Sequence, residues 1–408
     1  MSVKWENNQC PQSLISDIKT YFFINEDGNV GTKSGVEFQI DTLFSKVKHK
    51  YDLDYSVLYK IFKNAVTSAF KSNNLAKPDN VLSVFKSKCD DSLKIKNKYY
   101  LLTSINLKNV SVLKRRTING CVISFYKDIP NKYKKSRSEL MHKHRKESFT
   151  EQPHYLFVSI SVIAPDVKTA FKNAIGALDT LRAILQLNFS KSIPHFSFRE
   201  EEKYSSDSIL SLGQVHSLHL ESGACACINV WYEPNLKCKT SIEIDNFELT
   251  EATLTRTLKK LSHNPFSEHL FDSLQSYIVA IDHSEQEFRF MKLWSVIEKL
   301  VKSDDTKIII KRVSFLYENR GVIKEVLNSL RQARNINVHS GIKPLNVEMK
   351  NFNLCSYIED LFKFFIENPF NYNKLQMVID FISLPTDLQG IDQQIKNLKT
   401  VKKFIGAV

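Results

Sequence analysis

EFRFMKLWSVIEKLV, residues 287–301, reads as one continuous helix and gives the clearest indication of the fold. It is one of five long segments after residue 247 that share this helical character, at residues 250–261, 268–282, 287–301, 322–338 and 354–366. Strand-like runs are absent among them. The sequence therefore predicts an α-helical bundle from residue 248 to residue 408.

The chain before this bundle has a mixed character. Residues 1–79 read as mainly helical, and Pro78 and Asp79 indicate a boundary. The pattern of residues 80–247 predicts one long helix after Asp166 and several strands. The strands are expected at residues 99–102, 121–126, 155–163, 196–199, 215–220, 225–232 and 241–244. We therefore expect an α+β multidomain protein, in which a mixed α+β N-terminal region precedes a helical C-terminal domain.

The composition favours a polyanion as partner. The formal net charge is +13 and comes largely from lysine, and neutralising phosphate groups releases counterions. A lysine-rich surface also arises without any such partner, so charge alone leaves this open. Seven cysteines at irregular spacings do not predict a disulfide framework. Because neither a signal peptide nor an apolar membrane span is recognisable, we expect a cytoplasmic protein with no membrane partner.

The run LRQARNINVHSG, residues 330–341, combines residues suited to catalysis. It lies late in the predicted helix 322–338 and places Arg334 and Asn335 shortly before His339, with Gly341 as a helix-stopping residue. At about 100° per residue, Asn335 and His339 lie on one helix face. The long side chain of Arg334 would reach the same groove, so that three polar groups converge.

Together with the Leu-Trp-x-x-x-Glu pattern of Leu293, Trp294 and Glu298, this run resembles the signature of HEPN ribonucleases, in particular their Apea-like branch. The resemblance covers roughly residues 268–367. It implies a HEPN-like helical domain that acts as a metal-independent endoribonuclease without a cofactor. It also implies a homodimer, in which two copies of the motif form one composite active site.

The same resemblance implies a role in bacterial antiviral defence. Cleavage of RNA in the infected cell would act as a toxin and cause abortive infection. The α+β region, within residues 1–247, would then sense a phage-derived trigger or restrain the nuclease.

The residue types suit RNA, because RNA carries its own nucleophile, the 2′-hydroxyl beside the scissile phosphate. His339 would exchange protons near neutral pH and Arg334 would bind phosphate oxygens, with Asn335 completing the catalytic cluster. Glu298 is a supporting residue that would orient Arg334 or neutralise its charge, with a plain surface carboxylate as the open alternative. Three further basic residues are candidate contacts to RNA: Lys311, Arg312 and Arg331.

Other interpretations of these residues stay open at this point. His339 also suits the C-terminal end of a helix, where a cation is favourable. The domain would alternatively be a non-catalytic HEPN module for RNA binding or assembly. A third alternative is a HEPN toxin that a partner nucleotidyltransferase silences.

Several further groupings carry less weight. Arg137 and His142 repeat the Arg-to-His spacing, but they lie in a charged insertion at residues 128–153, which we interpret as solvent-exposed. Glycine-rich phosphate loops are not recognisable. Five possible metal ligands lie close together in sequence: His216, His219, Cys225, Cys227 and Cys238. Their spacings fit no common zinc module, so we expect buried, reduced side chains there and no metal site.

Overall fold

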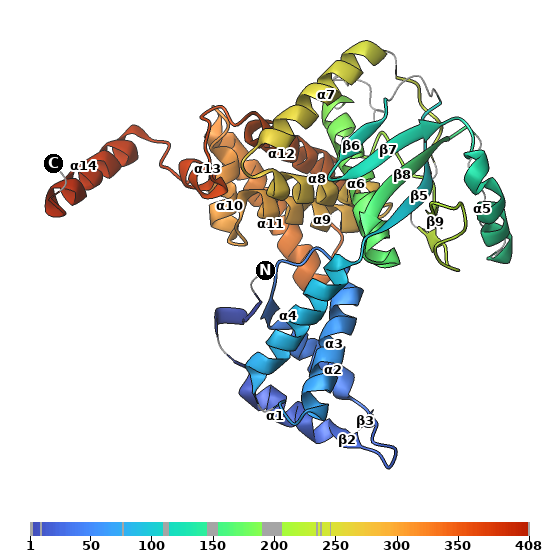
Figure 1. The fold of residues 1–408 in the computed structure, drawn as a ribbon. Coiled ribbons are helices and arrows are strands. Elements are labelled where there is room, and N and C mark those ends of the chain that lie inside the picture. The colour runs from blue at the N-terminus through green and yellow to red at the C-terminus, as the bar shows by residue number, and fades with distance from the viewer. Residues whose placement is uncertain are drawn as a thin grey trace.

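The computed structural model describes residues 3–8, 10–75, 77–108, 114–144, 154–189, 206–233, 236, 239–244 and 246–406. These residues form a mixed α+β fold with fourteen α-helices and a six-stranded sheet. In Figure 1 a helical N-terminal part lies below the sheet and the C-terminal helices, and the last helix projects from the body. The α+β class predicted from the sequence is thereby confirmed.

The N-terminal part has an apolar core of its own. Its helices are α1 (Gln12–Tyr21), α2 (Val36–Ser45), α3 (Tyr55–Lys71) and α4 (Pro78–Lys94), and a short 3-10 helix, η1 (Glu6–Asn8), precedes them. Two small strand pairs complete it: β1 (Lys4–Trp5) with β4 (Val47–Lys48), and β2 (Phe22–Ile24) with β3 (Val30–Thr32). Phe44, Phe62 and Phe85 pack their rings together at the centre.

The boundary expected at residue 79 falls in the first turn of α4. Pro78 is the first residue of this helix, a position where its missing N–H costs no hydrogen bond. The apolar face of α4, from Val81 to Cys89, is buried in the N-terminal core. The core of this part therefore extends past residue 79.

An antiparallel sheet with the strand order β10-β9-β5-β8-β7-β6 forms the centre of the molecule. The strands are β5 (Asn97–Ile105), β6 (Arg116–Ile118), β7 (Cys121–Tyr126), β8 (Leu156–Ala164), β9 (Val215–Leu220) and β10 (Trp231–Tyr232). Strands β5 and β8 pair along their whole length, from Asn97 opposite Ala164 to Ile105 opposite Leu156. Their branched and aromatic residues suit such a pleated, buried position.

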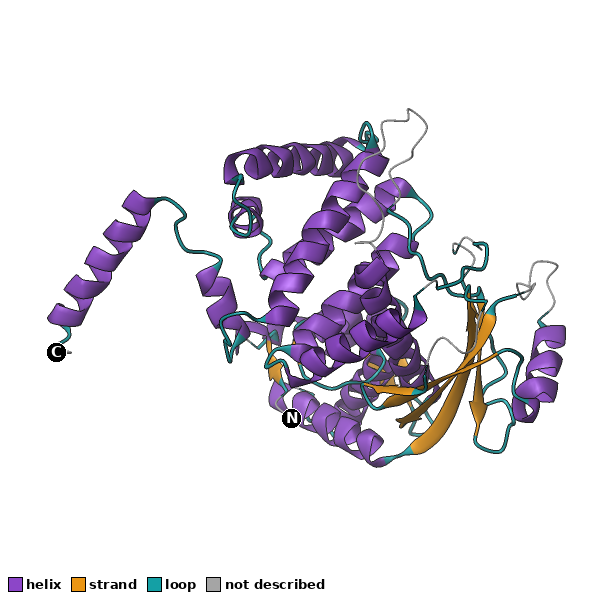
Figure 2. Ribbon diagram, turned by 90° about the horizontal axis from the view of Figure 1, so that it is seen from above, coloured by secondary structure: helices purple, strands orange, loops and turns teal. Residues whose placement is uncertain are grey.

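Helix α6 (Val167–Phe189) connects the sheet to the C-terminal helices. It starts after Asp166, whose Oδ1 accepts hydrogen bonds from the backbone N–H groups of Lys168 and Thr169, each at 2.9 Å. One side of α6 lies on the sheet and another contacts α8 (Ser267–Asp282). Leu178 and Leu181 are consequently buried, as expected for a helix that is enclosed on several sides. Figure 2 shows most of the helices on one side of the sheet and a single helix, labelled α5 (Asn131–Lys143) in Figure 1, on the other.

The C-terminal helices share the apolar core of the sheet. Ile160 of β8, Leu178 of α6 and Trp294 belong to one continuous cluster. Besides α8, these helices are α7 (Phe247–His263), α9 (Gln286–Val301), α10 (Thr306–Ser314), α11 (Arg320–Ser340), α12 (Val347–Glu367), α13 (Leu375–Phe381) and α14 (Leu388–Phe404). The five predicted helices are confirmed as α7, α8, α9, α11 and α12, whereas α10, α13 and α14 were not predicted. Residue 247 marks the start of α7, while the core continues across it.

Two predicted strands are largely wrong. Only Trp231–Tyr232 of the expected strand 225–232 pairs as a strand, because a turn after Leu220 brings Cys225 back beside His219. The expected strand 241–244 is reduced to one bridge between Ile242 and Leu107. The expected strand 196–199 lies outside the described residues.

The charged insertion contains helix α5 (Asn131–Lys143), and the interpretation of Arg137 as solvent-exposed was wrong. Arg137 is 1% exposed and donates hydrogen bonds to the carbonyl oxygens of Leu102 and Val215, each at 3.2 Å, and to Ser217 Oγ at 2.6 Å. The β5–β9 pairing ends at Leu102 opposite Ser217. The guanidinium therefore satisfies backbone acceptors at the end of this ladder, and α5 covers the face of the sheet opposite α6.

Candidate active site on helix α11

Helix α11 places the Arg-Asn-His run on its last two turns. Leu327 and Leu330 bury the middle of the helix in the core, whereas residues 331–340 are half-buried or exposed. The helix ends at Gly341, which has a φ of 64° and whose N–H donates to the carbonyl oxygen of Asn337 at 3.0 Å. The predicted helix stop at Gly341 is confirmed, since this left-handed conformation favours glycine.

Arg334 lies beside Glu298 of the neighbouring helix α9. It follows Leu327 and Leu330 at helical spacing, so its side chain points along the buried side of α11. One guanidinium nitrogen, Nη2, is 3.9 Å from Glu298 Oε1, and both side chains are less than a third exposed. This distance is an ion pair without a direct hydrogen bond.

Trp294 fixes the position of the Glu298 carboxylate. Its indole Nε1–H donates to Glu298 Oε1 at 2.8 Å, across one turn of α9. Burial raises the pKa of the Glu298 carboxyl, while the Trp294 hydrogen bond and the Arg334 charge lower it. Trp294 is therefore both a core residue and a hydrogen-bond donor to the candidate site. Its spacing of four residues from Glu298 was the sequence signal for this contact.

Asn335 and His339 lie on a different side of α11 from Arg334. Asn335 Oδ1 accepts a long hydrogen bond of 3.4 Å from Arg334 Nη1, and His339 is exposed in the last turn. Five residues along a helix correspond to about 140° around its axis between Arg334 and His339. A single chain therefore brings Arg334, Asn335 and Glu298 together, and His339 stands apart from this group.

The hydrogen bonds at the C-terminal end of α11 show whether His339 caps this helix. Within residues 246–406, the hydrogen bonds at this end come from the backbone of Gly341 and from Asn337 Nδ2, which donates to the carbonyl oxygen of Ile342 at 3.3 Å. The His339 imidazole makes no hydrogen bond to another residue that the structure describes. Its position in the last turn suits the helix dipole, and its ring remains accessible.

The three basic residues considered for RNA contacts differ in availability. Arg312 donates from Nε to Ser383 Oγ at 2.8 Å and from Nη1 to the carbonyl oxygens of Val301 and Lys302 at 2.6 and 3.2 Å. Arg312 therefore holds α10 against the end of α9 and against the segment that follows α13, and its guanidinium is engaged in these protein contacts. Lys311 is exposed and Arg331 is half-buried.

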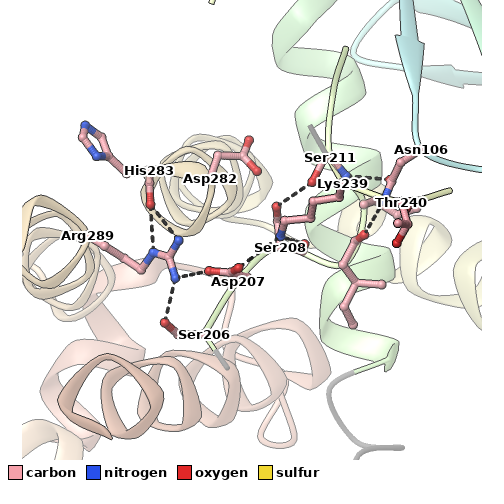
Figure 3. Close-up of polar contacts among 12 residues, drawn as sticks. Asn106, Ser206, Asp207, Ser208, Ser211, Lys239, Thr240, Asp282, His283 and Arg289 are labelled. Carbon is pink, nitrogen blue, oxygen red and sulfur yellow. Dashed lines mark hydrogen bonds and ion pairs between the residues drawn. The ribbon is translucent and has the colours of Figure 1, made fainter. Parts of the chain in front are cut away.

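A polar cluster that the sequence did not reveal joins distant parts of the core (Figure 3). Arg289, which is 3% exposed, donates to the carbonyl oxygen of His283 at 2.7 Å, to Ser206 Oγ at 3.0 Å and to the carboxylate of Asp207. These contacts tie the segment before β9 to the start of α9. We assign Arg289 to the fold, because its donors are directed at neighbouring protein groups.

Arg182 of α6 is the centre of a second buried ionic group. It binds Asp179 Oδ1 at 2.8 Å and both carboxylate oxygens of Asp282 at 2.7 Å. Burial raises the pKa of Asp179 to about 6, although the charge of Arg182 opposes this shift. The group fastens α6 to the end of α8 and so connects the sheet to the C-terminal helices.

The histidines considered as metal ligands are engaged in hydrogen bonds on the sheet. His216 Nδ1 lies 2.7 Å from Thr103 Oγ1, and His219 lies between Ser136 Oγ at 3.0 Å and Ser217 Oγ at 2.9 Å. Cys225 Sγ is 4.0 Å from His219 Nδ1, and Cys238 lies outside the described residues. In the part of the chain that the structure describes, no group of three or more His, Cys, Asp or Glu side chains is placed to hold a metal ion.

Comparison with protein-family models, curated proteins and solved structures gives no match to this chain. None of the helices within the described residues has the length and apolar character that crossing a lipid bilayer requires.

Proposed function

We propose that this protein is a metal-independent endoribonuclease whose active site is built on the exposed end of α11. The observation that carries the proposal is that the end of α11 presents both Arg334, paired with Glu298, and an accessible His339 about 140° away around the helix axis. The guanidinium is oriented by a carboxylate at 3.9 Å and keeps capacity for a phosphate. The resemblance to HEPN ribonucleases, including a HEPN-like fold of the C-terminal helices, belongs to the same proposal.

The reaction would use the RNA's own 2′-hydroxyl. Its oxygen attacks phosphorus, an O2′–P bond forms, and the P–O5′ bond breaks. One imidazole accepts the proton of the 2′-hydroxyl, another donates a proton to the leaving O5′, and Arg334 stabilises the extra negative charge on phosphorus. The products are a 2′,3′-cyclic phosphate and a 5′-hydroxyl.

Two copies of the chain are needed for this arrangement. One His339 cannot serve as base and acid at the same moment, and about 140° of helix rotation separates it from Arg334 in its own chain. A two-fold pairing of α11 helices would bring His339 of one protomer toward Arg334 of its partner. Such an isologous dimer is the commonest oligomer of soluble proteins.

Glu298 acts in this proposal as a positioning residue. Trp294 holds one carboxylate oxygen, and the carboxylate in turn holds Arg334 near the surface. Asn335 contacts the guanidinium from the same helix and lies on the face of His339. Lys311 and Arg331 would add attraction for the RNA backbone.

The biological role follows from the resemblance alone and is part of the proposal. The protein would act in a bacterial cell against phage, and the residues before 248 would sense a trigger or restrain cleavage. A non-catalytic RNA-binding module is the second candidate, and the net charge of +13 favours it. A salt-sensitive RNA complex that is never cut would support that candidate.

The experiment that tests the activity uses purified protein and total RNA in EDTA. Arg334→Ala and His339→Ala are each expected to reduce cleavage at least about 100-fold. Gln332→Ala is the matched control, because Gln332 is exposed on the same helix and has no role in the proposed site. Equal cleavage by all four proteins would overturn the proposal.

A further inference from the structure

Helix α14 projects from the body with its apolar side uncovered. It begins at Asp387, whose Oδ1 accepts a hydrogen bond from the backbone N–H of Gly390 at 2.7 Å, and none of its residues is buried. Figures 1 and 2 both show it extending away from the other helices. Leu388 is 81% exposed and Leu398 is 66% exposed. Most of the stability of a helix in a protein comes from packing of its apolar face, so this helix would gain stability from a partner.

The exposed apolar residues of α14 form a heptad seam. Spacings of three and four residues alternate along Leu388, Ile391, Ile395, Leu398, Lys402 and Ile405. This alternation is the pattern of the a and d positions of a two-stranded coiled coil, and Lys402 is its one polar member. A second helix with the same seam would cover it.

The charges beside the seam favour an antiparallel partner of identical sequence. When Ile395 packs opposite Leu398 of the partner subunit, Ile391 lies opposite Lys402 of the partner subunit, and both helices overlap fully. On the flank, Asp392 then lies near the partner subunit's Lys399, and symmetry forms this pair twice. A parallel pair would instead bring Asp392 near the partner subunit's Asp387 and create repulsion.

We propose that α14 pairs antiparallel with α14 of a second copy of this chain, through the seam from Leu388 to Ile405. This interface is separate from the pairing of α11 helices that the ribonuclease proposal requires. It goes beyond the proposed function and does not depend on RNA cleavage. Two chains joined by α14 raise the effective concentration of their remaining surfaces for one another.

Disulfide trapping in the full chain tests the register. Ile395→Cys and Leu398→Cys are prepared as separate full-length proteins, one with a mass tag, and co-expressed or mixed before oxidation. The antiparallel pair predicts a covalent species that contains both chains and is absent when either variant is oxidised alone. A parallel pair would cross-link each variant with itself, and that result would overturn the proposal.

Charge exchange tests the same interface without cysteine. Asp392→Lys and Lys399→Asp are each expected to weaken dimerisation about tenfold, because two ion pairs become two repulsions. The double exchange is expected to restore it, with the mass measured by light scattering or sedimentation. Restored mass and mixed cross-linking support the proposal.

Two further outcomes would contradict it. No mixed cross-link, with α14 protected within a monomer, would mean that the seam docks on its own chain, for example on the open pocket lined by Leu316, Tyr317 and Phe364. A dimer whose mass is insensitive to all charge exchanges and gives no mixed cross-link would place the dimer contact elsewhere. Ile395→Asp disrupts the seam on a helix that has no buried residue. The thermal unfolding of this variant and of the charge and cysteine variants should match that of the wild type, which checks that all of them fold.

Discussion

Arg334 Nη2 of α11 lies 3.9 Å from Glu298 Oε1 of α9, the same oxygen that accepts the indole hydrogen bond of Trp294 at 2.8 Å. The carboxylate thus joins a buried aromatic residue to a guanidinium at the surface. This relationship makes Glu298 the residue that sets where Arg334 lies.

Glu298→Gln tests that relationship. The amide oxygen still accepts from Trp294, but the charge that attracts Arg334 is lost, which is worth about 1 kcal/mol, or roughly fivefold in rate. Because burial raises the pKa of Glu298, wild-type activity should also decline on the acid side as this carboxyl protonates. The variant should lack that part of the pH profile. If the pH profile of Glu298→Gln matches that of the wild type, Glu298 does not position Arg334.

Gly341→Ala tests the end of α11. Gly341 has a φ of 64° and open space around its Cβ position, so the cost is purely conformational, about 1 kcal/mol. The last turn with His339 should fray. RNA cleavage should therefore fall clearly, whereas the melting temperature should change only slightly. Gly321→Ala is the control, since it also has open space but lies in the first turn at negative φ. Equal effects of the two substitutions would contradict the account.

Arg137→Met tests the docking of α5 on the sheet. It leaves the carbonyl oxygens of Leu102 and Val215 and the hydroxyl of Ser217 without their donor, so the free energy of unfolding should fall by about 2–4 kcal/mol. Lys135→Met on the same helix is the control, because its side chain is 91% exposed. Urea denaturation measures both. A loss no larger than that of the control would show that α5 is not held by Arg137.

The buried histidines predict lower stability in acid. Burial lowers the pKa of His216 to about 3 and of His219 to about 4, whereas both titrate near about 6.5 when unfolded. Between about pH 6.5 and 4 the unfolded chain therefore binds more protons, and the free energy of unfolding falls as the pH falls. Asp179, whose pKa is raised to about 6, has the opposite effect on the pH dependence of the free energy of unfolding. This effect is the same in the wild type and in a His219 variant.

The measurement compares urea denaturation of the wild type and His219→Gln between pH 7.5 and 4.5. In the variant, the free energy of unfolding should fall less steeply as the pH falls. The difference is the contribution of one histidine, a slope of up to about 1.4 kcal/mol per pH unit. Identical slopes in the two proteins would show that His219 does not titrate as its burial predicts.

Local sequence pattern predicted the long elements and failed where tertiary contacts decide. Strand β7 (Cys121–Tyr126) and the helix stop at Gly341 follow from strong local preferences. Arg137 looked solvent-exposed, because nothing in its hydrophilic neighbourhood reveals the strand ends that it covers. The short helices α10 and α13 lacked a long apolar period, and α14 was missed although its seam is regular.

The candidate site was predictable to the same degree. A contact of Glu298 with Arg334 was one of two interpretations that the sequence left open, and the structure places the two side chains side by side. The contacts of Arg312 with Val301 and Ser383 were not foreseeable, because helix packing creates them. The Arg182–Asp282 pair likewise joins helices that are distant in sequence.

The most direct test of the central claim is the chemistry of the RNA ends that the protein produces in EDTA. We expect 2′,3′-cyclic phosphate and 5′-hydroxyl ends with the wild type and with Gln332→Ala, and none above background with His339→Ala or Arg334→Ala. Ends that carry a 5′-phosphate, or cyclic phosphate ends formed equally by His339→Ala, would contradict it.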